Sequence, residues 1–115
     1  MEILTLLIKN ASFDKIIAGE KKEEKRTITP STQKKYVKIT PNEVTLIMYD
    51  AILFKAGHEE DAPEALVKID KTELEYEADE DGYIKLYEDD NNNLLIEDAE
   101  MVYTLGEIIS SKNLK

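Results

Sequence analysis

The segment Gly19-Glu20-Lys21-Lys22-Glu23-Glu24-Lys25-Arg26 decides how the first third of this chain folds. An unbroken run of charged residues follows a glycine here, and no core absorbs such a run, so it is either a solvated turn or a site. Upstream, apolar residues alternate from Leu4 to Ile8 as in a strand, and they recur at helical spacing between Phe13 and Ile17. A glycine readily takes the left-handed conformation that ends a helix. The predicted order is therefore strand, short helix, glycine and charged strand.

The remaining sequence predicts a mostly β protein. Asn10 or Ser12 is the expected cap of the first helix, and a second short helix is expected over Pro30–Tyr36, capped by Thr29. Strand-like runs follow at 44–49, 51–55, 65–69, 74–77, 83–87, 94–96 and 101–109, separated by a turn at 79–82 and polar loops at 57–61 and 89–93. Several short strands, with helices confined to the first third, predict an α+β fold built on a compact barrel or curled sheet.

Gly19, Lys21, Glu24 and Arg26 read as G-x-K-x-x-E-x-R. With the preceding helix and a downstream Thr-Pro turn, this pattern resembles the signature of the ASCH domain, a small β-barrel family related to the PUA RNA-binding domains. A second segment, residues 49–54 with 57 and 61–63, is similar to a subgroup of small bacterial and phage-borne members. The resemblance implies one PUA-like β-barrel domain over residues 1–115, with a ligand cleft at the signature.

Composition narrows the class of protein. A chain of 115 residues fits one domain, and its hydrophobic fraction of 42% is ordinary, whereas its charged fraction of 35% is high. The absence of cysteine excludes a disulfide framework, thiolate metal sites and a cysteine nucleophile. The sequence contains neither a long apolar run nor the layout of a secretory signal, so we expect a soluble cytoplasmic protein that does not bind membranes.

The net charge of −10 is distributed unevenly along the chain. Residues 1–41 contain nine Lys or Arg and five Asp or Glu, whereas residues 42–115 contain six and twenty. An acidic protein repels a long phosphate backbone, so duplex DNA is not an expected partner. Basic residues nevertheless gather around the signature and at Lys34, Lys35 and Lys38. Either they form a local positive patch for a nucleotide or short strand, or the asymmetry cancels on folding.

The signature has a chemistry of its own. If residues 21–28 form a strand, Lys22, Glu24 and Arg26 share one face, because side chains alternate with period two. The guanidinium of Arg26 suits phosphate, the carboxylate of Glu24 can hold it in place, and Lys21 would reach over the same cleft. We expect this cleft to bind a nucleotide or short single-stranded RNA. The alternative is a salt bridge that only completes the fold.

Catalysis is a second hypothesis that stays open. The resemblance implies it, since some ASCH-like proteins are small amidohydrolases that deacylate acylated cytidine nucleosides through the signature Lys, a Thr and a later Glu. Lys21 matches that pattern, but Glu24 stands at the Thr position. Only in this alternative are Lys21 and Glu24 catalytic, with Glu24 as general base for an attacking water.

Other residues are assigned to the rim of the same cleft. Tyr49 and Phe54 are expected to flank the site, where aromatic rings can stack on a base, and the sole histidine, His58, is either a solvated loop residue or a contact to base or sugar at the rim. A single histidine and no cysteine leave no multi-histidine metal site, so neither a metal nor a cofactor is expected. A third hypothesis makes the acidic second half a protein-interaction face. The sequence leaves the oligomeric state open.

Overall fold

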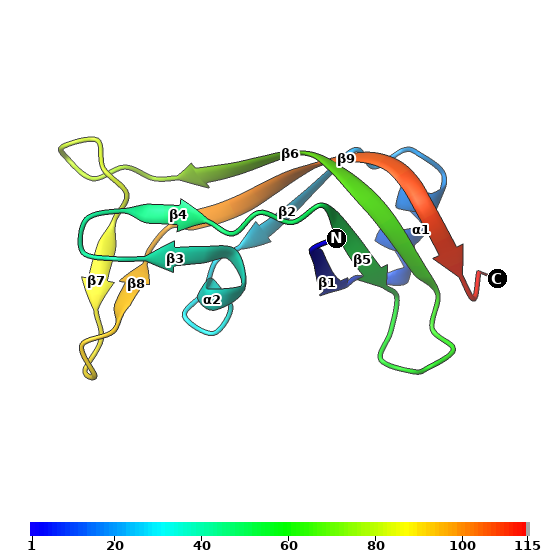
Figure 1. Ribbon diagram of the computed structural model, residues 1–115, viewed down its shortest axis with the longest axis horizontal. Helices are drawn as coiled ribbons and strands as arrows, with labels where there is room; N and C mark the ends of the chain where they lie inside the picture. Colours follow the sequence, from blue (N-terminus) through cyan, green and yellow to red (C-terminus); the bar gives the residue numbers. More distant parts are fainter. Residues whose placement is uncertain (115) are drawn as a thin grey trace. The chain divides into compact units, whose positions relative to one another are not determined.

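The computed structural model describes residues 1–114 as a mostly β chain of the α+β class (Figure 1). The elements in chain order are β1 (Ile3–Leu7), α1 (Asn10–Ile17), β2 (Glu23–Thr27), α2 (Gln33–Tyr36), β3 (Val37–Ile39), β4 (Val44–Leu46), β5 (Ala51–Lys55), β6 (Glu64–Tyr76), β7 (Leu86–Glu88), β8 (Leu94–Ile96) and β9 (Ala99–Lys112). In the described residues they form one five-stranded sheet in the order β1-β5-β6-β9-β2 and two hairpins, β3-β4 and β7-β8. The predicted fold class is thus confirmed at this level.

The opening strand–helix–glycine order is confirmed. β1 alternates exposed and buried residues and pairs in parallel with β5. α1 ends in a Schellman motif, because Gly19 takes φ 74° while its N–H donates to Ile16 O at 3.0 Å and the N–H of Glu20 donates to Lys15 O at 2.9 Å. The predicted side-chain cap is wrong: extended Lys9 holds the N-cap position and makes no side-chain cap bond, since Asn10 is already helical.

Several predicted strands have other bounds in the structure, among them 44–49, which shortens to β4 (Val44–Leu46), and 83–87, where β7 covers Leu86–Glu88. The runs at 65–69 and 74–77 belong to one continuous strand, β6, and the last strand extends over Ala99–Lys112. β3, which the sequence did not reveal, pairs antiparallel with β4. The five-stranded order is open at β1 and β2, and no closed barrel is seen among residues 1–114, so the predicted barrel is not confirmed.

The second helix is shorter than predicted. Residues 30–32 form a turn and α2 begins at Gln33, with Thr32 rather than Thr29 at the N-cap. Thr29 instead stabilises the turn, because its N–H donates to Thr32 Oγ1 at 2.9 Å and its carbonyl accepts the N–H of Gln33 at 2.9 Å. The hydroxyl and carbonyl groups of the Thr29–Thr32 segment thereby provide the local hydrogen bonds that a longer helix would have supplied.

The chain divides into two compact units. The first comprises residues 1–24, 49–72 and those described from Tyr103 onward, and the second comprises residues 25–48 and 73–102. β2, β6 and β9 each run from one unit into the other. Whether the chain behaves as one domain stays a prediction. Each unit has its own buried apolar residues, among them Leu6, Phe13, Ile52, Phe54 and Val67 in the first and Ile28, Tyr36, Val37, Ile96 and Met101 in the second.

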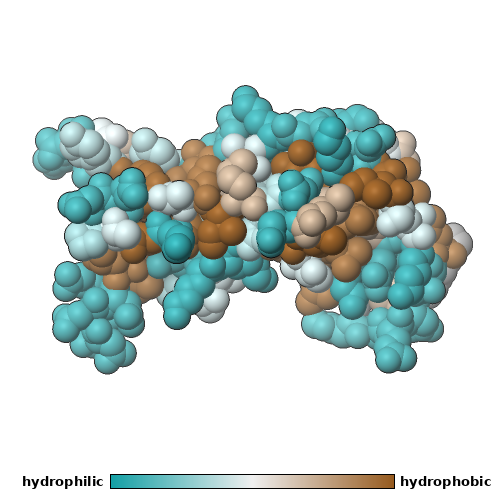
Figure 2. All heavy atoms as spheres, in the orientation of Figure 1, coloured by the Kyte–Doolittle hydropathy of each residue, from teal (hydrophilic) through white to brown (hydrophobic). Residues whose placement is uncertain are grey.

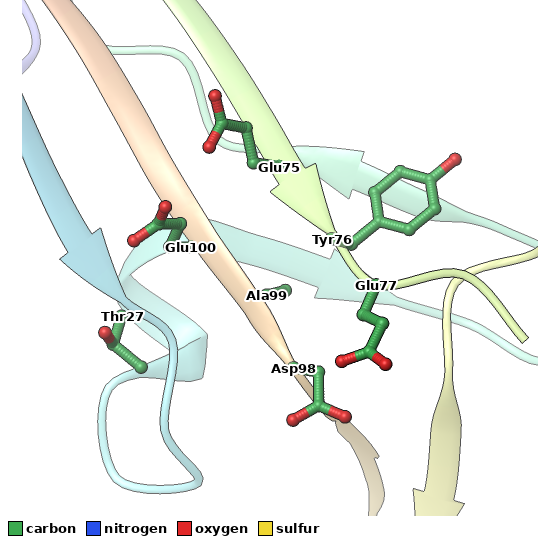
Figure 3. Close-up of a pocket in the computed structure, with 7 residues that line it drawn as sticks. All are labelled: Thr27, Glu75, Tyr76, Glu77, Asp98, Ala99 and Glu100. Atoms are coloured by element: carbon green, nitrogen blue, oxygen red, sulfur yellow. The ribbon is translucent and has the colours of Figure 1, made fainter.

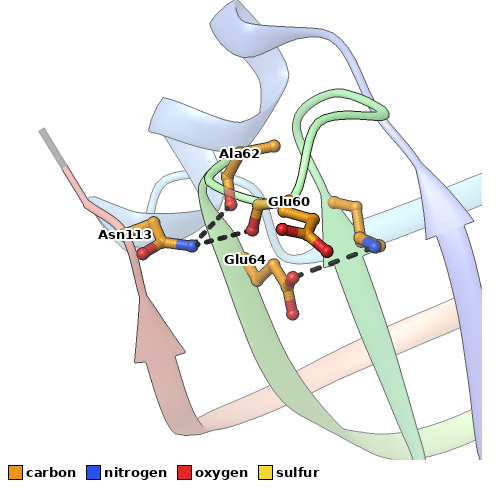
Figure 4. A network of polar contacts seen from close by, with 5 residues as sticks. Glu60, Ala62, Glu64 and Asn113 are labelled. Carbon is orange, nitrogen blue, oxygen red and sulfur yellow. Dashed lines mark hydrogen bonds and ion pairs between the residues drawn. The ribbon is translucent and has the colours of Figure 1, made fainter.

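The C-terminal end of β9 is tied to the loop that precedes β6 (Figure 4). Asn113 Nδ2 donates to Ala62 O at 3.2 Å and to Glu60 O at 3.5 Å, while the ammonium of Lys55 lies 3.9 Å from Glu64 Oε2. These contacts lie within the first unit. In the part of the chain that the structure describes, no helix has both the length and the apolar character needed to cross a membrane.

Candidate functional site

The structure brings Lys21 and Glu24 together at the start of β2. Lys21 Nζ lies 3.9 Å from Glu24 Oε1, and the Glu24 side chain is 8% exposed whereas that of Lys21 is 27% exposed. A carboxylate removed from water needs a partner, and an ammonium at this distance supplies one. Glu24 therefore anchors Lys21, whose side chain remains in reach of solvent.

A pocket of about 230 Å³ lies beside this pair, within the first unit. Its polar wall includes Gly19, Lys21, Lys22 and Glu107, and its apolar wall includes Val67 and Leu105. The N–H of Leu105 donates to Lys22 O at 2.8 Å, so backbone pairing with β9 fixes the charged segment against the apolar wall.

Lys22 brings a second ammonium to this pocket. A Cβ added to Gly19 would lie 3.8 Å from Lys22 Nζ, which places that ammonium against the glycine turn. Lys22 is exposed and has no ion pair among residues 1–114. The pocket thus combines one ammonium held by a buried carboxylate and one without an ion pair, and Glu107 adds a further carboxylate to its lining.

Gly106 shapes the opposite side of the pocket. A Cβ at this position would overlap the carboxylate of Asp70, which β6 places beside it. The absence of a side chain at 106 therefore leaves room for Asp70, and this explains a glycine inside a long strand.

The other predicted site residues do not line this pocket. Arg26 is half-buried two residues farther along β2, where the strand passes into the second unit. Phe54 is 0% exposed in the core, so its predicted role in base stacking is corrected: β5 is paired on both sides and this ring faces inward. His58 is exposed and lines a separate shallow pocket with Ile8.

Tyr49 lies near the N-terminus of the chain. Its hydroxyl has a raised pKa because burial disfavours the phenolate, and the negative charge of Glu2 raises the pKa further. The backbone links the same segments, since the N–H of Asp50 donates to Glu2 O and that of Glu2 to Asp50 Oδ2, each at 2.8 Å. Tyr49 is therefore half-buried beside Glu2 rather than at the Lys21 pocket.

A groove rich in carboxylates lies within the second unit (Figure 3). It has a volume of about 410 Å³ and takes four carboxylates from β6, β9 and the residues next to them, namely Glu75, Glu77, Asp98 and Glu100. In Figure 3 the carboxylate of Glu77, next to β6, and that of Asp98, next to β9, point to the same region, and the ring of Tyr76 extends away from them. We call this set the carboxylate groove.

One lysine bridges part of the carboxylate groove. Lys85 Nζ lies 3.4 Å from Asp98 Oδ2 and 3.7 Å from Glu77 Oε1. The hydrogen bond to Asp98 raises the pKa of Lys85 most, desolvation opposes it, and the nearby charges of Glu77, Asp98 and Glu97 raise the pKa further. No set of three or more His, Asp or Glu side chains within residues 1–114 is arranged to hold a metal ion.

The sequence did not reveal several residues of the Lys21 pocket. Val67, Leu105 and Gly106 come from β6 and β9, far along the chain, and only the pairing of these strands brings them to the signature. Period-two patterns indicate a strand but not its neighbour. Gly106 was the one detectable signal, as a glycine inside a strand-like run.

Comparison with known proteins adds no relative. No protein-family model matches the sequence, and no curated protein or solved structure matches the chain. The class of protein therefore rests on the fold and the site alone: a mostly β, α+β chain with a small pocket lined by two lysines, a glutamate and apolar side chains.

Proposed function

We propose that this protein binds a nucleotide, either free or within a short single-stranded RNA, at the pocket beside Lys21 and Lys22. The observation that carries the proposal is an ammonium without a carboxylate partner, Lys22, in a pocket whose other lysine is anchored by buried Glu24. Ammonium groups bind phosphate, and the apolar wall offers a surface to base or sugar. The pocket volume of about 230 Å³ suits one nucleotide unit at most. Membership of the ASCH family and the closed PUA-like barrel belong to the same proposal, supported by the signature residues.

In this proposal each signature residue has a separate role. Lys22 and Lys21 take the phosphate. Glu24 is a positioning residue, because its carboxylate is almost wholly buried and does not line the pocket. Arg26 does not line the pocket, and its role stays the predicted one of a phosphate contact, which the fork geometry of a guanidinium suits.

The test is calorimetric titration with nucleoside monophosphates and short single-stranded RNA. Lys22→Gln and Lys21→Gln are each expected to weaken binding about tenfold, the loss of one charge-assisted contact. Lys112→Gln is the matched control, since Lys112 is an exposed lysine of the same unit that does not line the pocket. Equal affinities in all three variants, or no binding by the wild type, would contradict the proposal.

The amidohydrolase alternative needs Glu24 to contact a water on the substrate. Its carboxylate is instead 8% exposed and engaged with Lys21, so the geometry favours binding over hydrolysis. Incubation with acylated cytidine tests the alternative directly. Release of the nucleoside by the wild type, abolished in Glu24→Gln, would replace the binding proposal with an enzymatic one.

The carboxylate groove supports a second candidate function, binding of a basic protein segment. Four carboxylates line this groove of about 410 Å³, and three of them, Glu75, Glu77 and Asp98, lie 3.4–3.9 Å from Lys25 or Lys85, whereas Glu100 has no ion pair within residues 1–114. A Lys/Arg-rich peptide should bind with an affinity that falls with salt, and Glu100→Gln should weaken it. A peptide that binds Glu100→Gln as tightly as the wild type would exclude this groove.

A further inference from the structure

A second groove, of about 630 Å³, lies entirely within the second unit. One wall comes from α2 and β3 and carries Lys34 and Lys38. The other comes from the β7–β8 hairpin and carries Asn92 and Asn93. Apolar side chains, among them Leu95, also line it. We call it the α2–β8 groove, and its volume falls in the range typical of small-molecule sites.

The two walls are fixed to one another by a buried glutamine. Gln33 is 9% exposed, its Nε2 donates to Leu94 O at 2.9 Å, and its Oε1 accepts the N–H of Ile96 at 2.8 Å. The amide therefore pairs with the edge of β8 as a neighbouring strand would. A groove whose walls are already held in place loses little entropy when it binds a ligand.

The tip of the hairpin is also fixed. Asp89 Oδ1 accepts the N–H groups of Asn91 and Asn93 at 2.9 and 3.0 Å, and Oδ2 accepts Asn93 Nδ2 at 3.1 Å. These bonds lower the pKa of Asp89. The hydrophilic surface of this turn is visible at the lower left of Figure 2, where Figure 1 places the end of β7. Asp89, the one carboxylate that lines the groove, is thus engaged by its own turn.

The lysines on the opposite wall are not neutralised. Neither Lys34 nor Lys38 has a carboxylate within ion-pair distance in residues 1–114, although the chain has a net charge of −10. Because both ammonium groups at this groove lack a carboxylate partner, they create a local positive potential. Two ammonium groups that face polar amides and apolar side chains suit a ligand that has a doubly negative group at one end and an apolar part at the other.

We propose that the α2–β8 groove binds a phosphate monoester that carries an apolar body. Lys34 and Lys38 take the phosphate, which is close to a dianion at neutral pH. Leu95 and the other apolar residues take the body, and the side-chain amides of Asn92 and Asn93 hydrogen-bond to polar groups on it. This site is independent of the Lys21 pocket, because its lining residues all belong to the second unit.

The proposal is tested by titrating isotope-labelled protein with phenyl phosphate and following the NMR signals of Asn92, Asn93 and Leu95. Inorganic phosphate and phenol are the two comparison probes, the first lacking the apolar body and the second the charge. Phenyl phosphate should shift these signals and bind at least tenfold more tightly than either probe. Lys34→Gln with Lys38→Gln should weaken phenyl phosphate binding at least tenfold. Lys35→Gln, which alters an exposed α2 lysine outside the groove, should leave it unchanged.

If the double variant does not fold, the pH dependence of phenyl phosphate binding to the wild-type protein provides a second test. Affinity for phenyl phosphate should rise between about pH 5 and pH 7 as the second phosphate proton, with a pKa near 6, is lost. Affinity that stays flat over this range would overturn the proposal. So would shifts away from the hairpin, equal affinity in the double variant, or an equal loss in Lys35→Gln. Lys21→Gln should leave this binding unchanged, so failure here and failure of the proposed function are separate results.

Discussion

The amide of Gln33 is expected to be one of the largest single polar contributions to the second unit. β8 presents alternate backbone groups to its two sides: residues 93 and 97 hydrogen-bond to Asp89 and Lys85, which flank β7, whereas Leu94 O and the N–H of Ile96 face away. Gln33 satisfies both outward groups. Gln33→Met keeps an unbranched side chain of similar length and removes both hydrogen bonds.

The cost can be worked out from exposure. A buried backbone group left without a partner costs about 1–3 kcal/mol. Because Ile96 is 2% exposed, loss of the partner of its N–H should cost a free energy in the upper part of that range. Leu94 is half-buried and water reaches its carbonyl, so the cost there is lower. We expect Gln33→Met to lower the free energy of unfolding by about 2–3 kcal/mol. For a chain of this size that is a fall in Tm of roughly 10 °C.

The variant Gln33→Glu tests the two hydrogen bonds separately, because the protonation state of the new side chain depends on pH. A carboxylate still accepts from Ile96 but places a second acceptor against Leu94 O, whereas the protonated acid restores the donor. Burial against a carbonyl raises the pKa of this glutamic acid in the folded state. The protonated acid therefore stabilises the folded state fully at pH values below the unfolded-state pKa of about 4.3. This stabilisation is lost as the pH rises through the higher pKa of the folded state.

The assay is urea unfolding followed by circular dichroism, together with hydrogen exchange of the Ile96 amide. Lys34→Met is the matched control, since it places methionine at an exposed neighbouring position of α2 and should change stability by less than about 0.5 kcal/mol. The reasoning is refuted if Gln33→Met is as stable as Lys34→Met. It is also refuted if Gln33→Glu is no closer to the wild type at pH 4 than at pH 7.

Three further outcomes follow from local geometry. Gly106→Ala drives a Cβ into the carboxylate of Asp70 and should cost about 1–2 kcal/mol in urea unfolding, with most of that loss absent when Asp70→Ala is the background. Gly19→Ala forces φ 74° on a residue with a Cβ and should cost about 1 kcal/mol, whereas Gly19→Asn should cost less; thermal unfolding compares the two. The hydrogen bonds that lower the pKa of Asp89 stabilise the hairpin fully at pH values above the ordinary pKa of 3.8. This stabilisation is lost as the pH falls through the lower pKa of the folded state. NMR titration of the carboxyl group should show the lowered pKa, and Asp89→Asn should remove the pH dependence.

Local patterns predicted local structure well. Gly19 was expected to end the first helix in the left-handed conformation, and its Schellman motif confirms this. The 79–82 turn is also confirmed, because Asp79 Oδ1 accepts the N–H groups of Asp81 and Tyr83, each at 2.9 Å. In both cases the deciding interactions lie within six residues of sequence, where residue type alone specifies the geometry.

The pairing of strands that lie far apart in the sequence could not be predicted from the sequence. The alternation that produced two short strands at 65–69 and 74–77 is interrupted by charged residues such as Asp70, which lies beside Gly106 of β9 rather than in a loop. Phe54 was placed at the site because residues 49–54 resemble a segment of small ASCH members, but in the structure its ring is buried in the core. Gln33 gave no signal, since its partners lie about sixty residues away.

The charge distribution constrains the length of any nucleic-acid ligand. Lys22 in one unit and Lys34 and Lys38 in the other bring positive charge to small concave sites, while the whole chain carries −10. At an ionic strength of about 0.01 M the Debye length is about 30 Å, so a long strand meets the acidic remainder of the protein as well as the pocket. At about 0.1 M the Debye length falls to about 10 Å. Salt then screens the repulsion from distant carboxylates more than it screens the short-range contact at the pocket.

Affinity for a mononucleotide should therefore fall steadily with salt. Affinity for a longer strand should first rise and then fall, and calorimetry across that range distinguishes the two. A long strand whose affinity only falls with salt, as for an ordinary basic RNA-binding surface, would show that the acidic residues do not face the bound strand.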